Sequence, residues 1–581
     1  MRPFLFAALL LAGAAQAADP NAVTPIGDPV AEPSSYRSIA TYWKVRGDAN
    51  GNARVEVRLR KTGETSWRTG LTLFRVQKGP HLGGEFGSPL TREVPLDGWL
   101  HAGSQLNVDP GAAYEVQLRL SDPDGGAAEK TLTVSTSDEP RQPEGGRTLH
   151  VVPGDGGGAG SPQNPFKGFE EADANAKAGD RMLVHAGLYP PLTATKSGEP
   201  GKPIVWQAAG DGEVLVGGAA PGPVGIRAEK LHDVWFQGLM VRKKDVGLSG
   251  IESGRIRVHR CDFQGVRSGI RADKNDKDGV RGWWITDNEI EGVTGWPPAE
   301  IELQNLPNWG IRMTGSDHVI AHNRVRRFRV GIATASSIRT ANLDILANDI
   351  GDARDAAIVF DGAERNVRCM ENRIVNAASG ILNRTTFGGP VYLVRNVLAN
   401  ISGEPFPMDA RPSGVLVLHN TAVRPGSALT LEGEAPIVNC VFRNNLFVGT
   451  SGEAACRIVT PMENCDVDHD GFTGGPWILF LKLPAESFPT PALAKEKSTV
   501  YKDAVLLQPS SPFAANIPIP ETAGTTLDRR LDFRLEPGSG AVDAALLIPG
   551  LNDPFAGKAP DLGALEVGAD LPPYGPRPAS R

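Results

Sequence analysis

The chain has 581 residues, a formal net charge of −7 at pH 7 and 6% aromatic residues. This length exceeds what one compact core can organise, so it indicates several domains or an extended solenoid. The 68 glycines and 47 prolines favour many short strands and turns over long helices, and the negative charge argues against a general nucleic-acid binder.

Residues 1–18 have the pattern of a signal peptide. Arg2 is the basic start, an apolar stretch runs from Phe4 to Ala12, and Ala15-Gln16-Ala17 forms a cleavage site. An N-terminal anchor helix is the alternative, but the apolar stretch is too short to cross a bilayer. We therefore expect a secreted protein, periplasmic or extracellular, without a transmembrane segment.

Residues 33–138 alternate apolar and polar side chains in short runs, as in Ala53–Leu59 and Tyr114–Leu120. Glycine, aspartate and proline turns separate the runs, which is typical of a β-sandwich. The segment Leu106–Tyr114 leads into a strand as in a tyrosine corner. The region resembles a fibronectin type III module, and residues 139–147 are expected to form a linker.

An asparagine or aspartate, followed two residues later by an apolar residue, recurs through the next part of the chain. With Gly238 in the same phase, successive spacings are 24, 26, 35, 25, 24, 24, 24 and 25 residues. A period near 24 predicts the coils of a parallel β-helix, whereas unrelated, evenly spaced strand pairs are the alternative. The series is Asp262, Asn288, Asn323, Asn348, Asn372, Asn396, Asn420 and Asn445.

Asparagine suits this position because it tolerates the left-handed backbone of a tight turn. Its side chain can also bond to the equivalent turn of the next coil. Three residues earlier stands an apolar residue, which predicts an inward stack. The members of this stack are Ile285, Ile320, Ile345, Cys369, Leu393, Val417 and Phe442.

Several segments resemble the entrance of pectin-lyase-like β-helix proteins: Leu149–Gly154, Asn164–Phe166, Ala178–Asp180 and Ala186–Tyr189. The tail segment Ala559–Glu566 is also similar to that group. The resemblance implies an all-β chain with a right-handed parallel β-helix over residues 148–570, a capping helix at about 166–178 and an irregular C-terminal tail. It implies no single reaction, because the group includes lyases, hydrolases, epimerases and adhesins.

The 35-residue spacing marks an insertion between two turns, and insertions in a solenoid often build the binding face. Exposed aromatic residues there are expected to stack on sugar rings, although a loop held by its own tryptophans is the alternative. The insertion carries Trp296, Glu300, Glu302, Trp309 and Arg312.

The strand after each turn begins with a small residue and an isoleucine, as in Gly310-Ile311. If the isoleucine points inward, alternate residues point outward. The arginines of this outward set favour an anionic, uronate-bearing polysaccharide, whereas a stabilising charge ladder is the alternative. The set comprises Arg271, Asp273, Arg312, Thr314, Asp361 and Arg384.

Two reactions suit these residues. In a lyase, arginine neutralises the uronate carboxylate while His322, Lys274 or Arg384 removes the adjacent proton. In a glycoside hydrolase, Asp355 and Asp361 flank the bond. The acidic run found in related proteins is altered here, since Arg354 and Val359 replace two acids, which weakens the hydrolase interpretation.

We expect a lyase first, with a hydrolase and a non-catalytic glycan-binding surface or matrix protein as alternatives. No required cofactor is expected. The oxygen-rich loop Asp273–Gly279 is a candidate for Ca²⁺, but its lysines oppose a cation and favour a solvated turn. Among five cysteines, Cys456 and Cys465 are close enough in sequence to pair.

Overall fold

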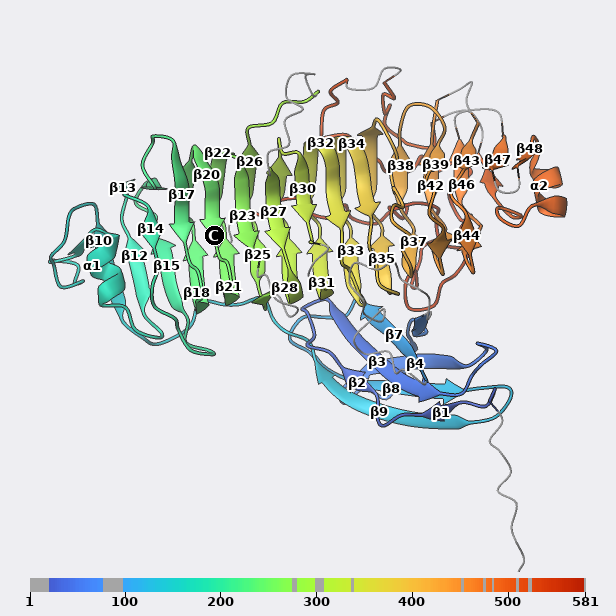
Figure 1. Ribbon diagram of the computed structural model, residues 1–581, viewed down its shortest axis with the longest axis horizontal. Helices are drawn as coiled ribbons and strands as arrows, with labels where there is room; N and C mark the ends of the chain where they lie inside the picture. Colours follow the sequence, from blue (N-terminus) through green and yellow to red (C-terminus); the bar gives the residue numbers. More distant parts are fainter. Residues whose placement is uncertain are drawn as a thin grey trace, which may run out of the picture.

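A computed structural model shows an elongated solenoid with a smaller β unit beside its middle (Figure 1). The structure describes residues 20–76, 98–273, 280–297, 308–335, 339–450, 454–473, 477–482, 485–507, 511–520 and 525–578. The predicted signal peptide lies outside these ranges. Within them, no helix is both long and apolar enough to span a membrane.

Two antiparallel sheets form the smaller unit. One contains β1 (Thr24–Pro25), β2 (Val30–Ala31), β3 (Ser38–Arg46), β6 (Phe74–Val76) and β7 (Gly98–Leu106); the other contains β4 (Arg54–Lys61), β5 (Arg68–Thr69), β8 (Ala113–Ser121) and β9 (Ala127–Ser135). Trp43 is fully buried between them. The hydroxyl of Tyr114 accepts a hydrogen bond from the backbone N–H of Asp109 at 2.9 Å, which closes the corner expected from the sequence.

The solenoid is a right-handed parallel β-helix, as predicted. Its first long sheet contains β10 (Thr148–Val152), β11 (Phe166–Lys167), β12 (Arg181–Val184), β15 (Ile204–Ala208), β18 (His232–Gln237), β21 (Gly254–His259), β24 (Val280–Arg281), β25 (Trp284–Thr286), β28 (Gly315–Ala321), β31 (Ala341–Leu346), β33 (Val367–Met370), β35 (Val391–Val394), β37 (Val415–Leu418), β41 (Val441–Arg443) and β45 (Asp466–Val467).

The second long sheet bends around the coils and contains β13 (Gly187–Leu188), β14 (Leu192–Thr193), β16 (Val214–Val216), β17 (Gly222–Arg227), β19 (Met240–Arg242), β20 (Lys244–Ser249), β22 (Asp262–Val266), β23 (Ser268–Ala272), β26 (Glu289–Gly292), β27 (Trp309–Met313), β29 (Arg324–Arg326), β30 (Val330–Ala333), β32 (Asp349–Phe360), β34 (Arg373–Asn383), β36 (Val397–Ile401), β38 (Thr421–Val423), β42 (Leu446–Val448), β46 (Gly471–Thr473) and β49 (Val505–Leu506). Two short sheets complete the last coils: β39 (Leu429–Leu431), β43 (Cys456–Ile458), β47 (Leu479–Lys482) and β48 (Ala485–Phe488), and β40 (Ile437–Val438) with β44 (Met462–Glu463).

The repeated asparagines form a buried ladder between the two long sheets. Asn323 Nδ2 donates to Asn348 Oδ1 at 3.0 Å, and the backbone N–H of Asn323 donates to the same oxygen at 2.9 Å. Each rung therefore satisfies polar groups that water cannot reach. The ladder runs from Asn288 through Asn323, Asn348, Asn372, Asn396, Asn420 and Asn445 to Asp470.

Two details of the predicted turn are wrong. The left-handed residue is the one before each asparagine, as at His322 (φ 56°). The first rung is Cys261 rather than Asp262, because the Cys261 N–H donates to Asn288 Oδ1 at 2.9 Å and Asp262 pairs in register with Glu289. The asparagines make the stacked side-chain bonds, whereas the residue before each asparagine adopts the left-handed turn conformation.

The predicted inward stack is confirmed, since all its members from Ile285 to Phe442 are fully buried. A helix, α1 (Phe169–Ala174), covers the first coil and is shorter than expected; α2 (Pro491–Lys497) lies at the opposite end (Figure 1). The C-terminal tail then returns along the solenoid, where the Gly575 N–H donates to the carbonyl of Ala347 at 2.9 Å.

The smaller unit is joined to the solenoid by apolar packing and buried polar contacts. Tyr36 and Leu106 pack in one cluster with Leu346 and Tyr392. The hydroxyl of Tyr392 also accepts from the backbone N–H of Ser104 at 3.1 Å. This packing fixes the position of the smaller unit against the first long sheet.

The proposed cysteine pairing is wrong, because all five cysteines are free thiols in the structure. Cys456 lies in β43, between Leu429 and Leu479. Cys465 instead lies beside Cys440, whose backbone N–H donates to its sulfur at 3.4 Å. The coil geometry separates residues that are close in sequence and brings together residues one coil apart.

Candidate functional site

A groove of about 330 Å³ crosses the outer side of four successive coils of the second sheet, over β27, β30, β32 and β34. Its charged and aromatic lining residues are Trp309, Arg312, Arg329, Asp355, Asp361 and Arg384. Asn308, Thr334 and several small apolar residues complete the lining. Five of the nine site residues expected from the sequence therefore meet in one groove.

The strand register explains this convergence. Ile311 pairs with Ile332, which pairs with Ile358, and all three are buried against the core. Because side chains alternate along a strand, the next residue of each coil faces outward. Arg312 consequently occupies the same outward row as Arg271 one coil earlier. Neighbouring rows lie about 4.8 Å apart along the solenoid.

Arg312 is held between an indole ring and a carboxylate. Its guanidinium carbon lies 4.6 Å from the centre of the Trp309 ring, and its Nε lies 3.6 Å from Asp273 Oδ2. Arg271 Nη2 lies 3.2 Å from the same carboxylate oxygen. Burial lowers the pKa of Arg312 below its usual value, with the charge of Asp273 opposing the shift. Two guanidinium groups thus share one carboxylate, leaving a net positive charge.

Asp355 lies on the opposite wall, where its Oδ2 is 3.3 Å from Arg329 Nε. Both side chains are nearly half exposed, at 47% and 45%. The backbone N–H of Arg329 donates to the side-chain oxygen of Asn308 at 3.2 Å. The end of the insertion therefore fixes the arginine that contacts Asp355.

Asp361 and Arg384 lie on adjacent coils, each two residues after a member of the outward row that contains Arg312. Thr334 holds the backbone of Asp361, because its hydroxyl both donates to the carbonyl and accepts from the N–H of Asp361 at 2.8 Å. Arg384 Nε lies 3.3 Å from Asp409 Oδ2, and this ion pair is about half exposed. The groove thus ends in Asp361, one of whose carboxylate oxygens is buried, and in the half-exposed Arg384.

Three described residues of the predicted site lie outside the groove lining: Arg271 (one coil before Arg312), His322 and Trp296. His322 sits at a ladder turn, where its Nδ1 is 3.1 Å from the carbonyl oxygen of Pro573 and burial lowers its pKa. Its left-handed backbone directs it to the tail side of the coil. Trp296 donates from Nε1 to the carbonyl of Thr525 at 3.5 Å. Glu300, Glu302 and Lys274 lie outside the described residues.

Sequence reasoning did not single out Arg329, Asn308, Asp409 or Glu404. Asn308 lies in the insertion, which is the signal that could have identified it, and Arg329 contacts Asn308 from the next coil. Glu404 lies one coil after Gly380 and outside the groove lining, and its backbone carbonyl accepts from the Gly380 N–H at 3.0 Å. Burial raises the pKa of Glu404 to about 7, which suits a proton donor near neutral pH.

The described residues contain no cluster of three or more histidine, cysteine, aspartate or glutamate side chains suited to a metal. Asp273, the first residue of the proposed Ca²⁺ loop, already contacts Arg271 and Arg312. The rest of that loop, residues 274–279, lies outside the described residues.

No protein-family model and no curated protein matches the sequence. Among solved structures, an alginate lyase from Paenibacillus sp. strain FPU-7 has 14% identity and a TM-score of 0.27, over 51% of this chain and 94% of that chain. The catalytic domain of a GH87 alpha-1,3-glucanase in complex with tetrasaccharides has 12% identity and a TM-score of 0.22, over 78% and 88%. Neither likeness is close enough to carry a function over to this chain.

Proposed function

We propose that the protein is a secreted enzyme that binds an acidic, uronate-containing polysaccharide in this groove and cleaves it by β-elimination. The observation that supports this function is the gathering of Trp309, Arg312, Asp361 and Arg384 from three coils in one groove. Indole stacks on the apolar face of a sugar ring, and guanidinium groups pair with carboxylates in a bidentate manner.

In the reaction, Arg384 neutralises the uronate carboxylate, which acidifies the proton on the adjacent carbon C5, while Arg312, three coils earlier, binds the carboxylate of another uronate of the same polysaccharide. Arg384 Nε contacts the Asp409 carboxylate and a guanidinium is a poor base, so we assign proton removal to the Asp361 carboxylate. The C5–H electron pair forms the C4=C5 double bond as the C4–O bond breaks. The leaving glycosidic oxygen takes up a proton, from Asp361 or from water.

A glycoside hydrolase is the second candidate, because Asp355 and Asp361 line the same groove. In that reaction one carboxyl protonates the leaving oxygen, and the other acts as base or nucleophile. Asp355 Oδ2 lies 3.3 Å from the Arg329 guanidinium, and we assign Asp355 the role of base or nucleophile in that reaction.

One experiment separates these functions. The mature protein is incubated with polygalacturonate, alginate, glucuronan and a neutral glucan, while absorbance near the ultraviolet band of an unsaturated uronate and reducing ends are both followed. A lyase raises both signals on a uronate polymer only. Reducing ends without absorbance indicate the hydrolase, and retention on a glycan column without either signal indicates a binding protein.

Single substitutions, compared with a control variant, then test the role of each carboxylate in the reaction. Asp361→Asn should abolish either cleavage, whereas Asp355→Asn should abolish hydrolysis but leave β-elimination within a few-fold. Glu229→Gln is the control, because Glu229 bonds Arg227 on an earlier coil outside the groove lining. Full activity of Asp361→Asn would contradict the assignment of the base.

A further inference from the structure

A second cavity, of about 460 Å³, lies where the smaller β unit meets the solenoid. We call it the junction pocket. Its walls are the segments 33–35 and 137–143 on one side and the outer faces of β18, β21, β25 and β28 on the other. This volume falls within the roughly 300–1,000 Å³ of small-molecule sites. The groove and the junction pocket share no lining residue.

Three large side chains form one outward row across the junction pocket. Trp235 pairs in register with Arg257, and Arg257 pairs with Trp284 on the following coil. The guanidinium carbon of Arg257 lies 5.0 Å from the centre of the Trp235 ring. The row therefore presents two indoles and a planar cation on the same wall.

Arg257 is unusual among the charged residues of this pocket. Its side chain is only 8% exposed, yet its Nε has no hydrogen-bond partner, and no described residue forms an ion pair with its guanidinium. Burial lowers its pKa to about 10. A buried guanidinium without an acceptor is unfavourable in the free protein, because its lost hydration is not replaced.

The other charged groups around the pocket already have partners. Arg255 bonds both carboxylate oxygens of Asp233, at 3.0 and 2.8 Å. Arg368 bonds Asp344, and Asp317 lies 3.1 Å from Arg281. Arg141 lies 3.5 Å from Asp138, at the exposed rim. Arg257 is therefore the cation of the junction pocket that can pair with a bound anionic ligand.

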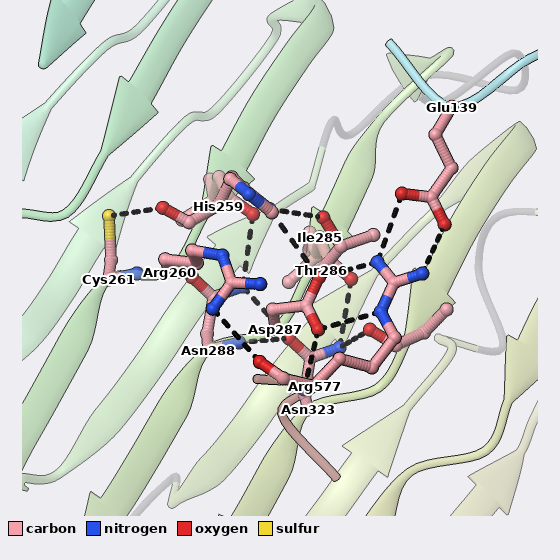
Figure 2. A network of polar contacts seen from close by, with 12 residues as sticks. Glu139, His259, Arg260, Cys261, Ile285, Thr286, Asp287, Asn288, Asn323 and Arg577 are labelled. Carbon is pink, nitrogen blue, oxygen red and sulfur yellow. Dashed lines mark hydrogen bonds and ion pairs between the residues drawn. The ribbon is translucent and has the colours of Figure 1, made fainter. Parts of the chain in front are cut away.

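The nearest acids do not supply that partner. The charges of Glu139 and Asp287 act on Arg257, but both carboxylates are bonded by Arg577 (Figure 2). Arg577 Nη2 donates to Glu139 at 3.0 Å and to Asp287 at 2.6 Å. The tail thus occupies the acids that would otherwise neutralise the pocket.

From this row we infer that the junction pocket binds a carboxylate-bearing sugar residue, with its ring against Trp235 or Trp284 and its carboxylate on Arg257. A guanidinium matches a carboxylate in two parallel hydrogen bonds, and indole faces accept sugar rings. The site would hold an acidic chain apart from the groove. The inference does not depend on cleavage, because it concerns binding at a different cavity.

The test measures binding by calorimetry in an Arg312→Gln/Arg329→Gln/Arg384→Gln background, which removes the guanidinium groups that line the groove. The probes are the trisaccharides of galacturonate, guluronate and mannuronate, with maltotriose as the neutral match and inorganic phosphate as a competitor. At least one acidic trisaccharide should bind at one site per chain and quench tryptophan fluorescence. Adding Arg257→Leu should weaken this binding by about ten- to a hundred-fold, and Arg257→Lys should weaken it less.

A second readout separates binding from a structural role. Because Arg257 lacks an acceptor, Arg257→Leu should keep or raise the Tm of the ligand-free protein while removing the increase in Tm caused by the trisaccharide. Unchanged trisaccharide affinity in Arg257→Leu would overturn the inference. It would also be overturned by equal binding of maltotriose, by phosphate displacing the sugar at equal concentration, or by the absence of binding to all three acidic probes.

Discussion

Arg577, close to the C-terminus, clamps the fully buried carboxylate of Asp287 at a turn of the solenoid. Its backbone N–H and its Nε both donate to Asp287 Oδ1 at 2.9 Å, and Nη2 donates to Oδ2 at 2.6 Å (Figure 2). The same guanidinium bonds Glu139 in the predicted linker. One side chain thus ties the tail, the solenoid and the segment after the smaller β unit together.

Arg577→Ala should lower the free energy of unfolding by about 3 kcal/mol, because the buried Asp287 carboxylate loses its guanidinium and keeps only the backbone N–H of residue 577 and His259, 3.6 Å away. Urea unfolding followed by circular dichroism measures this change. Arg530→Ala is the matched control, since Arg530 pairs with Asp528 at the exposed surface of the same tail. Equal, small effects of the two substitutions would contradict the clamp.

The clamp should also respond to acid. Burial raises the pKa of Asp287, but the bonds and charge of Arg577 outweigh burial and hold it below its usual value. A depressed pKa stabilises the fold above the pKa of the unfolded chain, and this stabilisation is lost as pH falls through the folded value. Proteolysis of the tail should therefore increase below about pH 4, and Asp287→Asn should remove this pH dependence.

Asp470 ends the asparagine ladder, and burial raises its pKa to about 7. It accepts from Asn445 Nδ2 at 2.8 Å and from the hydroxyl of Tyr501 at 2.9 Å. Since the folded state binds this proton more tightly than the unfolded chain, its contribution to stability is complete below about pH 4 and is lost as pH rises through about 7. Asp470→Asn should raise stability at pH 8 by on the order of 2 kcal/mol and flatten its pH profile. A loss of stability at pH 8 would contradict this.

Within the ladder, Asn372→Ala should cost about 3–5 kcal/mol, because several buried donors and acceptors lose their partners together. Asn348 donates twice to Asn372, which in turn donates to Asn396 and to the carbonyl of Ile345. Asn464→Ala is the control, because Asn464 makes a similar bond to Asn439 at the surface. Thermal denaturation of both variants gives the comparison.

We expect binding to an acidic polysaccharide to survive removal of calcium. The carboxylate of Asp273 is already shared by Arg271 and Arg312, which leaves it a poor ligand for a cation. Affinity chromatography with EDTA and with added Ca²⁺ measures this. A loss of retention in EDTA that Ca²⁺ restores would show that the loop holds a metal.

Arg312→Gln should weaken retention on a uronate polymer by about ten-fold and reduce its salt sensitivity, because one charge-assisted contact is lost. Retention on a neutral glucan should not change. Arg227→Gln is the control, since Arg227 pairs with Glu229 on a coil outside the groove lining. Equal losses for the two variants would indicate a diffuse charge effect.

The repeat made the solenoid and much of the groove predictable. The period of Asn323, Asn348 and Asn372 fixed which residues stack, so the outward positions of Arg312 and Arg384 followed from alternation along the strands. The position of His322 did not follow, because its direction depends on a left-handed turn and on a tail that returns from 251 residues later. The junction pocket could not be predicted from the sequence either, because it forms only where the smaller β unit packs against the first long sheet.

The asparagine ladder also allows the solenoid to change its length by whole coils. Because each asparagine makes the same bonds to the coils on either side, as Asn372 does to Asn396 and to the carbonyl of Ile345, a whole coil can be duplicated or deleted between equivalent asparagines without leaving an unmatched rung. Such an event over β32 to β36 would lengthen or shorten the groove by about 4.8 Å. Descendants of this protein could thereby acquire or lose one sugar-binding position in a single genetic step, while the rest of the solenoid keeps its register.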